Sequence, residues 1–281
     1  MRISPTGIEV LNEPTVNYCP LHESLYGSKH IDVEAVQKSV EKKVSEYGFC
    51  CRNRLFNAEP IVAYGASEML QVWLEKGLVD CAVIVCEGAG TVITANGELV
   101  QAIGARLTGI VKTSPIQEII EHIESNGGTV LEKSSARIDQ AEGVKQAVGS
   151  GFKRVAVTVA SSSARAISEI RQFEADTGLD VLVFSVCNTR AGDADVQHIN
   201  KADIACASAS SILRTKVGNK ALIQLGVTIP VYALTEKGKR LILAYLAESD
   251  HKLVVFRTKA LPYQPEGKGP TLKNQSKHKR P

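Results

Sequence analysis

The chain has 281 residues, 44% of them hydrophobic, which is enough to fill the core of one large α/β domain or of two modest ones. Seven cysteines without a Cys-x-x-Cys pair, no signal peptide and no apolar run of membrane-spanning length argue against a secreted, disulfide-bonded or membrane-spanning protein. The formal net charge of +3 comes from the end of the chain, because residues 257–281 hold seven of the 33 Lys and Arg but one of the 30 Asp and Glu. The composition predicts a cytoplasmic protein with reduced thiols and a slightly acidic body.

The first part of the chain, residues 1–150, is predicted to be an N-terminal α/β half. Its first thirty residues contain several turn formers and are expected to form a covering segment. Apolar periodicity and β-branched runs then predict helices at 33–47, 67–76, 115–125 and 140–150, and strands at 80–86, 91–94 and 107–112.

The second part, residues 151–256, alternates strand and helix patterns more regularly. Strands are predicted at 154–159, 180–187, 203–206 and 229–234, helices at 164–177, 208–225 and 236–248, and an edge strand at 252–256. This alternation is typical of a Rossmann-like α/β fold, with a mostly parallel sheet flanked by helices. Whether the two halves share one sheet stays open.

The last part, residues 257–281, is predicted to be a disordered basic tail. It is rich in Pro, Gly and Lys and offers little apolar surface to bury. A short solvated terminus is a commoner explanation for such a segment than a nucleic-acid contact, so no nucleic-acid partner is predicted.

Three predicted strands end in cysteines, namely Cys86, Cys187 and Cys206. The carboxyl ends of parallel strands form the ligand crevice of open α/β sheets, so these thiols are expected at one edge, near Cys19 and Cys50. Thiolates can bind zinc or an iron–sulfur cluster. Free cysteines are also common buried hydrophobic residues, and both interpretations stay open.

A glycine-containing stretch follows the first of these strands. In Cys86-Glu-Gly-Ala-Gly90, the N–H groups of Gly88 and Gly90 could approach an anion, while Cys86 and Glu87 are candidates for a catalytic nucleophile and base. The spacing fits neither a dinucleotide fingerprint nor a P-loop. A tight strand-to-strand turn is the equally weighted alternative.

Hydroxyl groups and arginines follow the later strands. Ser161, Ser162 and Arg165 lie at one strand-to-helix junction, Ser208 lies at another, and Arg190 lies in the loop between them. Such junctions bind anions through free N–H groups, and guanidinium suits phosphate or carboxylate. The alternatives are a simple helix cap and a solvated loop side chain.

Nine segments of the chain resemble the methanogenesis marker protein 8 family, an archaeal family without assigned catalytic residues. They are Asn17–Leu21, Glu46–Cys50, Lys76–Thr91, Glu98–Gly104, Lys112–Ile116, Ile138–Lys145, Arg154–Ala160, Ala202–Ala207 and Ile229–Gly238. The resemblance runs from about Asn17 to Leu246 and leaves out the basic tail. It includes Cys19, Cys50, Cys86 and Cys206, which narrows the candidate metal ligands to these four.

The resemblance implies a role in methane-producing archaea, whose anaerobic cytosol tolerates an oxygen-sensitive cluster or a reactive thiolate. We therefore expect a cytosolic accessory protein of methanogenesis, acting in maturation or activation of methyl-coenzyme M reductase or in handling its cofactors, with that enzyme or its maturation factors as partners. The alternatives are a thiol-dependent enzyme that acts on a small anionic substrate, and a non-catalytic binding subunit.

Overall fold

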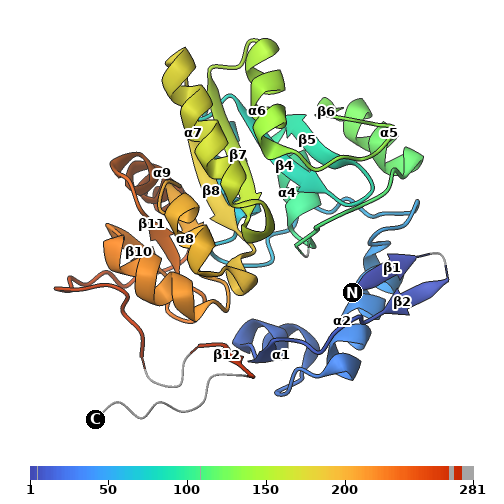
Figure 1. Cartoon of the computed structure of the whole chain (residues 1–281), viewed down its shortest axis with the longest axis horizontal. Helices are drawn as coiled ribbons and strands as arrows, with labels where there is room; N and C mark the ends of the chain where they lie inside the picture. The colour runs from blue at the N-terminus through green and yellow to red at the C-terminus, as the bar shows by residue number, and fades with distance from the viewer. Residues whose placement is uncertain (5, 108, 266–268, 274–281) are drawn as a thin grey trace.

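One eight-stranded mixed sheet organises the chain (Figure 1). The computed structural model describes residues 1–4, 6–107, 109–265 and 269–273. Across the sheet the strands run in the order β10 (Ile223–Leu225), β11 (Val231–Ala233), β9 (Ile204–Cys206), β8 (Asp180–Val186), β7 (Arg154–Ala160), β4 (Cys81–Cys86), β5 (Gly90–Thr94) and β6 (Gly128–Val130).

Most of these strands point the same way. The pairs β4·β7, β7·β8 and β8·β9 are parallel, whereas β5 and β11 are antiparallel to their neighbours on both sides. Strands β6 and β10 therefore share the direction of the four central strands. This confirms the predicted Rossmann-like α/β class, and it shows that strands from both sides of residue 150 lie in one sheet.

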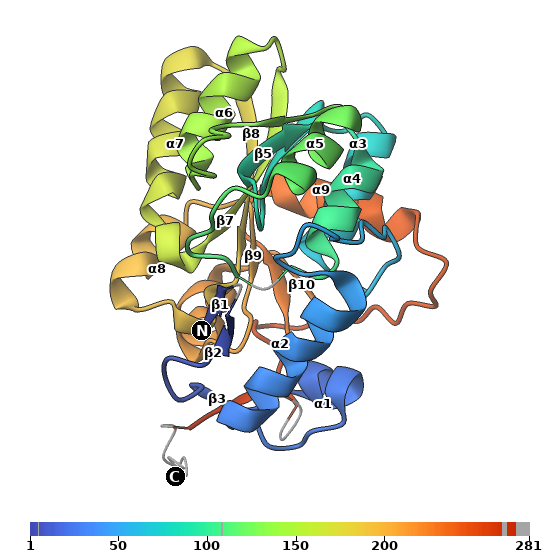
Figure 2. The same cartoon turned by 90° about the vertical axis from the view of Figure 1, so that its right-hand side faces the viewer.

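Helices cover both faces of the sheet, as Figure 2 shows. One face carries α3 (Ala66–Glu75), α4 (Gly97–Gly104), α5 (Gln117–Ser125) and α9 (Glu236–Ala247). The other carries α6 (Gln140–Gly149), α7 (Arg165–Thr177) and α8 (Asp193–Ile199). Because strand side chains alternate between faces, Val83 joins one core cluster and Ile84 the other.

The N-terminal segment lies at one end of the molecule (Figures 1 and 2). It comprises the hairpin β1 (Arg2–Ser4) and β2 (Gly7–Glu9), then β3 (Val16–Tyr18), α1 (Pro20–Tyr26) and α2 (Val33–Tyr47). Helix α2 begins at the Asp32 cap, whose carboxylate accepts from the Ala35 N–H, and ends at Gly48 in the left-handed region.

Asp203, directly before β9, connects the two helical layers at the amino ends of the strands. Its buried carboxylate accepts a hydrogen bond from Arg171 of α7 at 2.6 Å and from the Val183 N–H at 2.9 Å. It also accepts from the hydroxyl of Thr235, which caps α9, at 2.7 Å. A buried carboxylate needs such partners to offset its lost hydration. It thus fixes α7 and α9 relative to the same strand.

Several predicted elements differ from the structure. No strand forms among residues 107 and 109–112, which have no neighbouring strand to pair with. The predicted helix 208–225 is helical only over residues 211–220, mainly as a π-helical turn, Leu213–Val217, and a 3-10 turn, Gly218–Lys220, and its last part is strand β10. Gly226, with φ +68°, lies in the connection between β10 and β11.

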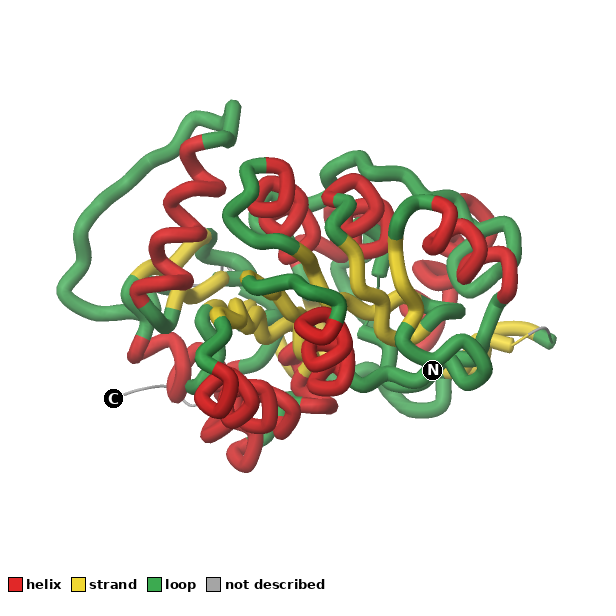
Figure 3. The backbone as a smooth tube through the Cα atoms, turned by 90° about the horizontal axis from the view of Figure 1, so that it is seen from above, coloured by secondary structure: helices red, strands yellow, loops and turns green. Residues whose placement is uncertain are grey.

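The chain after α9 also differs from the prediction. Residues 252–256 form no strand but belong to a loop that stands away from the helices, and Val254 is 91% exposed (Figure 3). In the predicted disordered tail, β12 (Thr271–Leu272) pairs with β3, whereas residues 266–268 and 274–281 lie outside the described residues. No helix in the described ranges is long and apolar enough to cross a membrane.

The close approach of α9 to β9 gives a test of this packing. A Cβ at Gly238 would lie 2.3 Å from the Asp203 carbonyl oxygen, whereas a Cβ at Gly149 of α6 would meet nothing within 4 Å. Gly238→Ala is expected to lower the free energy of unfolding by about 1–3 kcal/mol in urea titrations, because it overpacks the contact. Gly149→Ala is expected to be neutral or stabilising. Equal effects of the two substitutions would contradict the contact.

Candidate functional site

The stretch Cys86-Glu-Gly-Ala-Gly90 forms the tight turn between β4 and β5, in which Cys86 pairs with Gly90. Gly88 and Gly90 have φ values of +78° and +76°, and a Cβ at Gly90 would lie 2.3 Å from the Ala136 carbonyl oxygen. The Gly88 N–H already donates to the Thr113 hydroxyl at 2.8 Å. The structure thus supports the strand-to-strand turn, in which Gly88 and Gly90 allow the positive φ values and Gly90 allows the close approach to Ala136.

Glu87, in this turn, forms a fully buried ion pair with Arg54. The Arg54 Nε donates to the Glu87 Oε1 at 2.5 Å, and the two side chains are 1% and 0% exposed. The guanidinium also donates to the carbonyl oxygens of Ala102, at 3.0 Å, and Ile103, at 3.3 Å, in the last turn of α4. Those carbonyls carry the negative end of the helix dipole, so this location suits a cation.

Arg54 was not predicted from the sequence, because it lies 33 positions before its partner in a loop without periodicity. One signal was present, since a glutamate directly after a buried strand needs a cation if it remains charged. Arg54 also stacks on Phe56, 4.7 Å from the ring centre, and Phe56 stacks on His122 at 3.9 Å. The loop after α2 is therefore attached firmly to the β4–β5 turn.

The thiols beside this ion pair are held in the neutral form. Cys86 is fully buried and donates to the Glu87 carbonyl oxygen at 3.2 Å. Burial, reinforced by the Glu87 charge, raises the pKa of Cys86 well above its ordinary value, and burial raises the pKa of Cys50 to about 12. A nucleophilic cysteine requires a lowered pKa, so this geometry does not support the predicted roles of Cys86 and Glu87 as nucleophile and base.

Lys43, near the end of α2, is a second charged residue whose burial the sequence pattern did not indicate. Burial lowers its pKa to about 8, while the charge of Glu87 acts in the opposite direction. Its Nζ donates to the Arg106 carbonyl oxygen at 3.0 Å. A lysine with a pKa this close to neutrality is more common at functional sites than elsewhere.

The loops that follow β7, β8 and β9 are bonded to one another. The Ser161 hydroxyl donates to the Cys187 carbonyl oxygen at 3.1 Å, and the Asn188 N–H donates to the Ser208 hydroxyl at 3.0 Å. The buried Asn188 amide also donates to the Cys206 carbonyl oxygen at 2.9 Å. The predicted residues Ser161 and Ser208 thus lie at one continuous edge, and Asn188, which the prediction passed over, joins its loops.

The backbone at this edge adopts an uncommon conformation. Cys187 directly follows β8, Ser208 lies two residues after the end of β9, and their φ values are +53° and +49°. A non-glycine residue in the left-handed region costs about 1–2 kcal/mol, and such strain concentrates at functional sites. Cys187 is exposed, yet the atoms around its sulfur raise the pKa to about 11, mainly by desolvation.

Three predicted ligand-binding side chains are exposed beside these loops. Ser162 lies in the 3-10 turn after β7, Arg190 lies in the turn after β8, and the two turns contact each other. Arg165 begins α7 and pairs with Glu169 at 3.3 Å. A cation at a helix N-terminus is unfavourable, so an anion bound there would be stabilised by both the helix dipole and the guanidinium.

The four candidate metal ligands Cys19, Cys50, Cys86 and Cys206 do not form a ligand set. Within the described ranges, no three His, Cys, Asp or Glu residues are grouped so that they could hold a metal ion. Strands β7 and β8 separate Cys86 from Cys206, which places their strands about 14 Å apart at the usual spacing, whereas a zinc–sulfur bond is about 2.3 Å long. Sharing one sheet edge is thus not enough to bring these thiols together.

A family model described as "Uncharacterized protein conserved in archaea (DUF2099)" matches residues 1–247. The chain belongs to this archaeal family. It is 39% identical over 246 residues to "Uncharacterized protein MJ0054" of Methanocaldococcus jannaschii, a match that covers 87% of this chain and 86% of the relative. The family match ends with α9, so it includes the whole carboxyl edge and leaves out the exposed loop and β12.

Alkylation of the folded protein with iodoacetamide, followed by mass spectrometry, tests the assignment of the thiols. Cys187 is expected to react first, and its rate should rise about tenfold per pH unit up to its pKa of about 11, because the thiolate is the reacting form. Cys86 should react only when the chain unfolds. Alkylation of Cys86 in folded protein at pH 7, as fast as that of Cys187, would contradict its burial as a neutral thiol.

Proposed function

We propose that the protein binds a small anion at the exposed carboxyl ends of β7, β8 and β9. This edge site consists of Ser161, Ser162, Arg165, Cys187, Arg190 and Ser208. The main observation behind this proposal is the left-handed backbone at both Cys187 and Ser208. Hydrogen bonds between the loops hold these two strained residues close together, at the edge where open α/β sheets bind ligands.

The charges at the edge site support an anion. Arg190 lies in a turn that contacts the turn just before Arg165, and both arginines are exposed, so a bound phosphate or carboxylate can reach them without displacing buried groups. The hydroxyls of Ser161 and Ser208 already bond to neighbouring loops, and their contribution is to fix the shape of the edge. The exposed Ser162 is the hydroxyl that remains for the ligand.

A thiol-dependent enzyme has less support. Cys86 is neutral and buried, and Glu87 is occupied by Arg54. Cys187 is the exposed thiol of the edge site, but its raised pKa does not favour a thiolate at neutral pH. Binding rather than covalent catalysis is therefore the activity that we assign to this edge.

As the biological role we propose a cytosolic accessory protein of methanogenesis. The proposal rests on the resemblance to the methanogenesis marker protein 8 family, and a relative in Methanocaldococcus jannaschii is consistent with it. The ligand would then be an anionic cofactor, or cofactor precursor, of methyl-coenzyme M reductase. That enzyme or its maturation factors would be the partners.

Thermal unfolding with inorganic phosphate, against chloride at equal ionic strength, tests the edge site. Phosphate is expected to raise the melting temperature by about 2–4 °C for each kcal/mol that its binding adds to the free energy of unfolding. Arg190→Gln should abolish the rise, whereas the control Lys145→Gln, which removes an exposed charge from α6, should keep it. No rise in the wild type, or a full rise in Arg190→Gln, would contradict the site.

The same variants test the biological role in a deletion strain. Loss of the gene is expected to lower methyl-coenzyme M reductase activity or to change the cofactor content of that enzyme. The wild type and Lys145→Gln should restore it, and Arg190→Gln should not. Unchanged enzyme activity and cofactor content in the deletion strain would refute the accessory role but not the anion site.

A further inference from the structure

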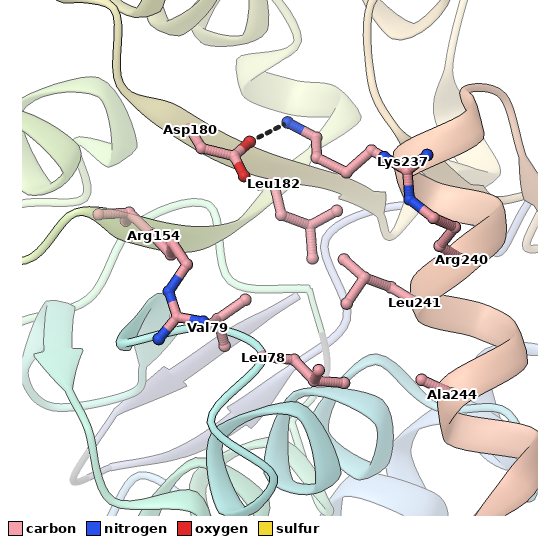
Figure 4. Close-up of a pocket in the computed structure, with 10 residues that line it drawn as sticks. Leu78, Val79, Arg154, Asp180, Leu182, Lys237, Arg240, Leu241 and Ala244 are labelled. Atoms are coloured by element: carbon pink, nitrogen blue, oxygen red, sulfur yellow. Dashed lines mark hydrogen bonds and ion pairs between the residues drawn. The ribbon is translucent and has the colours of Figure 1, made fainter.

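A cavity lies at the opposite edge of the sheet from the edge site, at the amino ends of the central strands (Figure 4). It has a volume of 290 Å³, and its walls come from the loop before β4, the starts of β7 and β8, and α9. This volume is near the lower limit of about 300 Å³ for small-molecule pockets, so it suits a ligand of few atoms.

The interior of this cavity is apolar. Val79 and Leu182 are buried, and Leu78 and Leu241 are half-buried beside them. Figure 4 shows Leu78, Leu182 and Leu241 between the strand side and the α9 side of the cavity. An alkyl group placed there would remove apolar surface from water on both the ligand and the protein.

Two of the three cations around the cavity are neutralised by the protein. Arg154 donates from Nε and Nη2 to the Asp80 Oδ1, at 3.0 and 2.5 Å. Lys237 donates to the Asp180 carboxylate at 2.9 Å and also lies 3.4 Å from Glu174. These two cations have little charge left to attract a ligand.

Arg240 is the third cation. It is exposed and has no hydrogen-bond or ion-pair partner among the described residues. It shares one face of α9 with Lys237, Leu241 and Ala244, because residues three and four apart align on a helix. The cavity thus combines an apolar interior with an uncompensated guanidinium, which is the complement of an alkyl chain that ends in an anion.

We propose that this cavity binds a small amphipathic anion, a short-chain carboxylate or phosphate monoester, with the alkyl chain against Leu78, Leu182 and Leu241 and the head group on Arg240. The site is distinct from the edge site and does not depend on the proposed function.

The protein contains a built-in reporter for this cavity. Trp73 is its single tryptophan, is fully buried, and donates from its indole N–H to the Leu241 carbonyl oxygen at 2.9 Å. Because Leu241 lines the cavity, a bound ligand is expected to change the Trp73 emission. Titrations with hexanoate, hexyl phosphate and hexanol, each repeated by calorimetry, then compare head groups on the same alkyl chain.

The anions are expected to bind at least tenfold more tightly than hexanol, because a charge-assisted hydrogen bond contributes about that factor. Arg240→Gln should remove this difference, whereas Lys239→Gln, a neighbouring cation on α9 that pairs with Glu236, should keep it. Ala244→Leu should block all three ligands by filling the cavity. Whether hexanoate or hexyl phosphate binds more tightly identifies the head group.

The proposal is overturned if none of the three ligands binds by calorimetry, or if hexanol binds as tightly as the anions. It is also overturned if Arg240→Gln binds like the wild type, or if Ala244→Leu leaves binding intact. The rise in melting temperature with phosphate, which depends on Arg190, is measured in a separate experiment. The proposed cavity site and the edge site can therefore be refuted independently.

Discussion

The buried ion pair between Arg54 and Glu87 is the constraint on which the arrangement of the carboxyl edge depends. Glu87 lies in a turn between two buried strands and is fully inaccessible, so its charge is tolerable only with a partner. Arg54 supplies that partner and bonds to the end of α4 as well. The loop after α2, with Cys50, is thereby fixed against the end of β4.

This constraint divides the carboxyl edge into two parts. The part at β4 is closed, and its thiols are neutral because they are surrounded by protein and lie near a carboxylate. The part at β7, β8 and β9 stays open, with exposed arginines and a strained backbone that Asn188 holds in position. The two parts differ in chemistry although they share one sheet edge, and the open part is the one that a ligand can reach.

The elements that could be predicted from the sequence are those whose pattern of apolar residues follows from burial. Strands 80–86, 154–159 and 180–187 agree with β4, β7 and β8, because buried parallel strands are continuous apolar runs, and helix 33–47 agrees with α2 because both of its caps are readable. The order of these elements was enough to predict that Ser161, Cys187 and Ser208 share an edge. Where local pattern and tertiary pairing disagreed, as at β10, the pairing determined the structure.

The sequence did not predict interactions between distant polar residues. Arg54 and Glu87 are 33 positions apart, and neither lies in a periodic pattern. The predicted metal site lacked one piece of information for a similar reason. Strand ends in the sequence show which cysteines share an edge, but not how many strands separate Cys86 from Cys206. Roles could therefore be assigned to single residues at the edge only once the strand order and the side-chain contacts were known.

A double-mutant cycle on Arg54 and Glu87 in urea unfolding measures how strongly the two buried charges depend on each other. Arg54→Met and Glu87→Gln are each predicted to lower the free energy of unfolding by about 3–5 kcal/mol, and the double substitution by much less than their sum. The exposed pair Glu34 and Lys38, also 2.5 Å apart, is the matched control, with a coupling below about 1 kcal/mol. A coupling between Arg54 and Glu87 as small as that of the control would contradict the account.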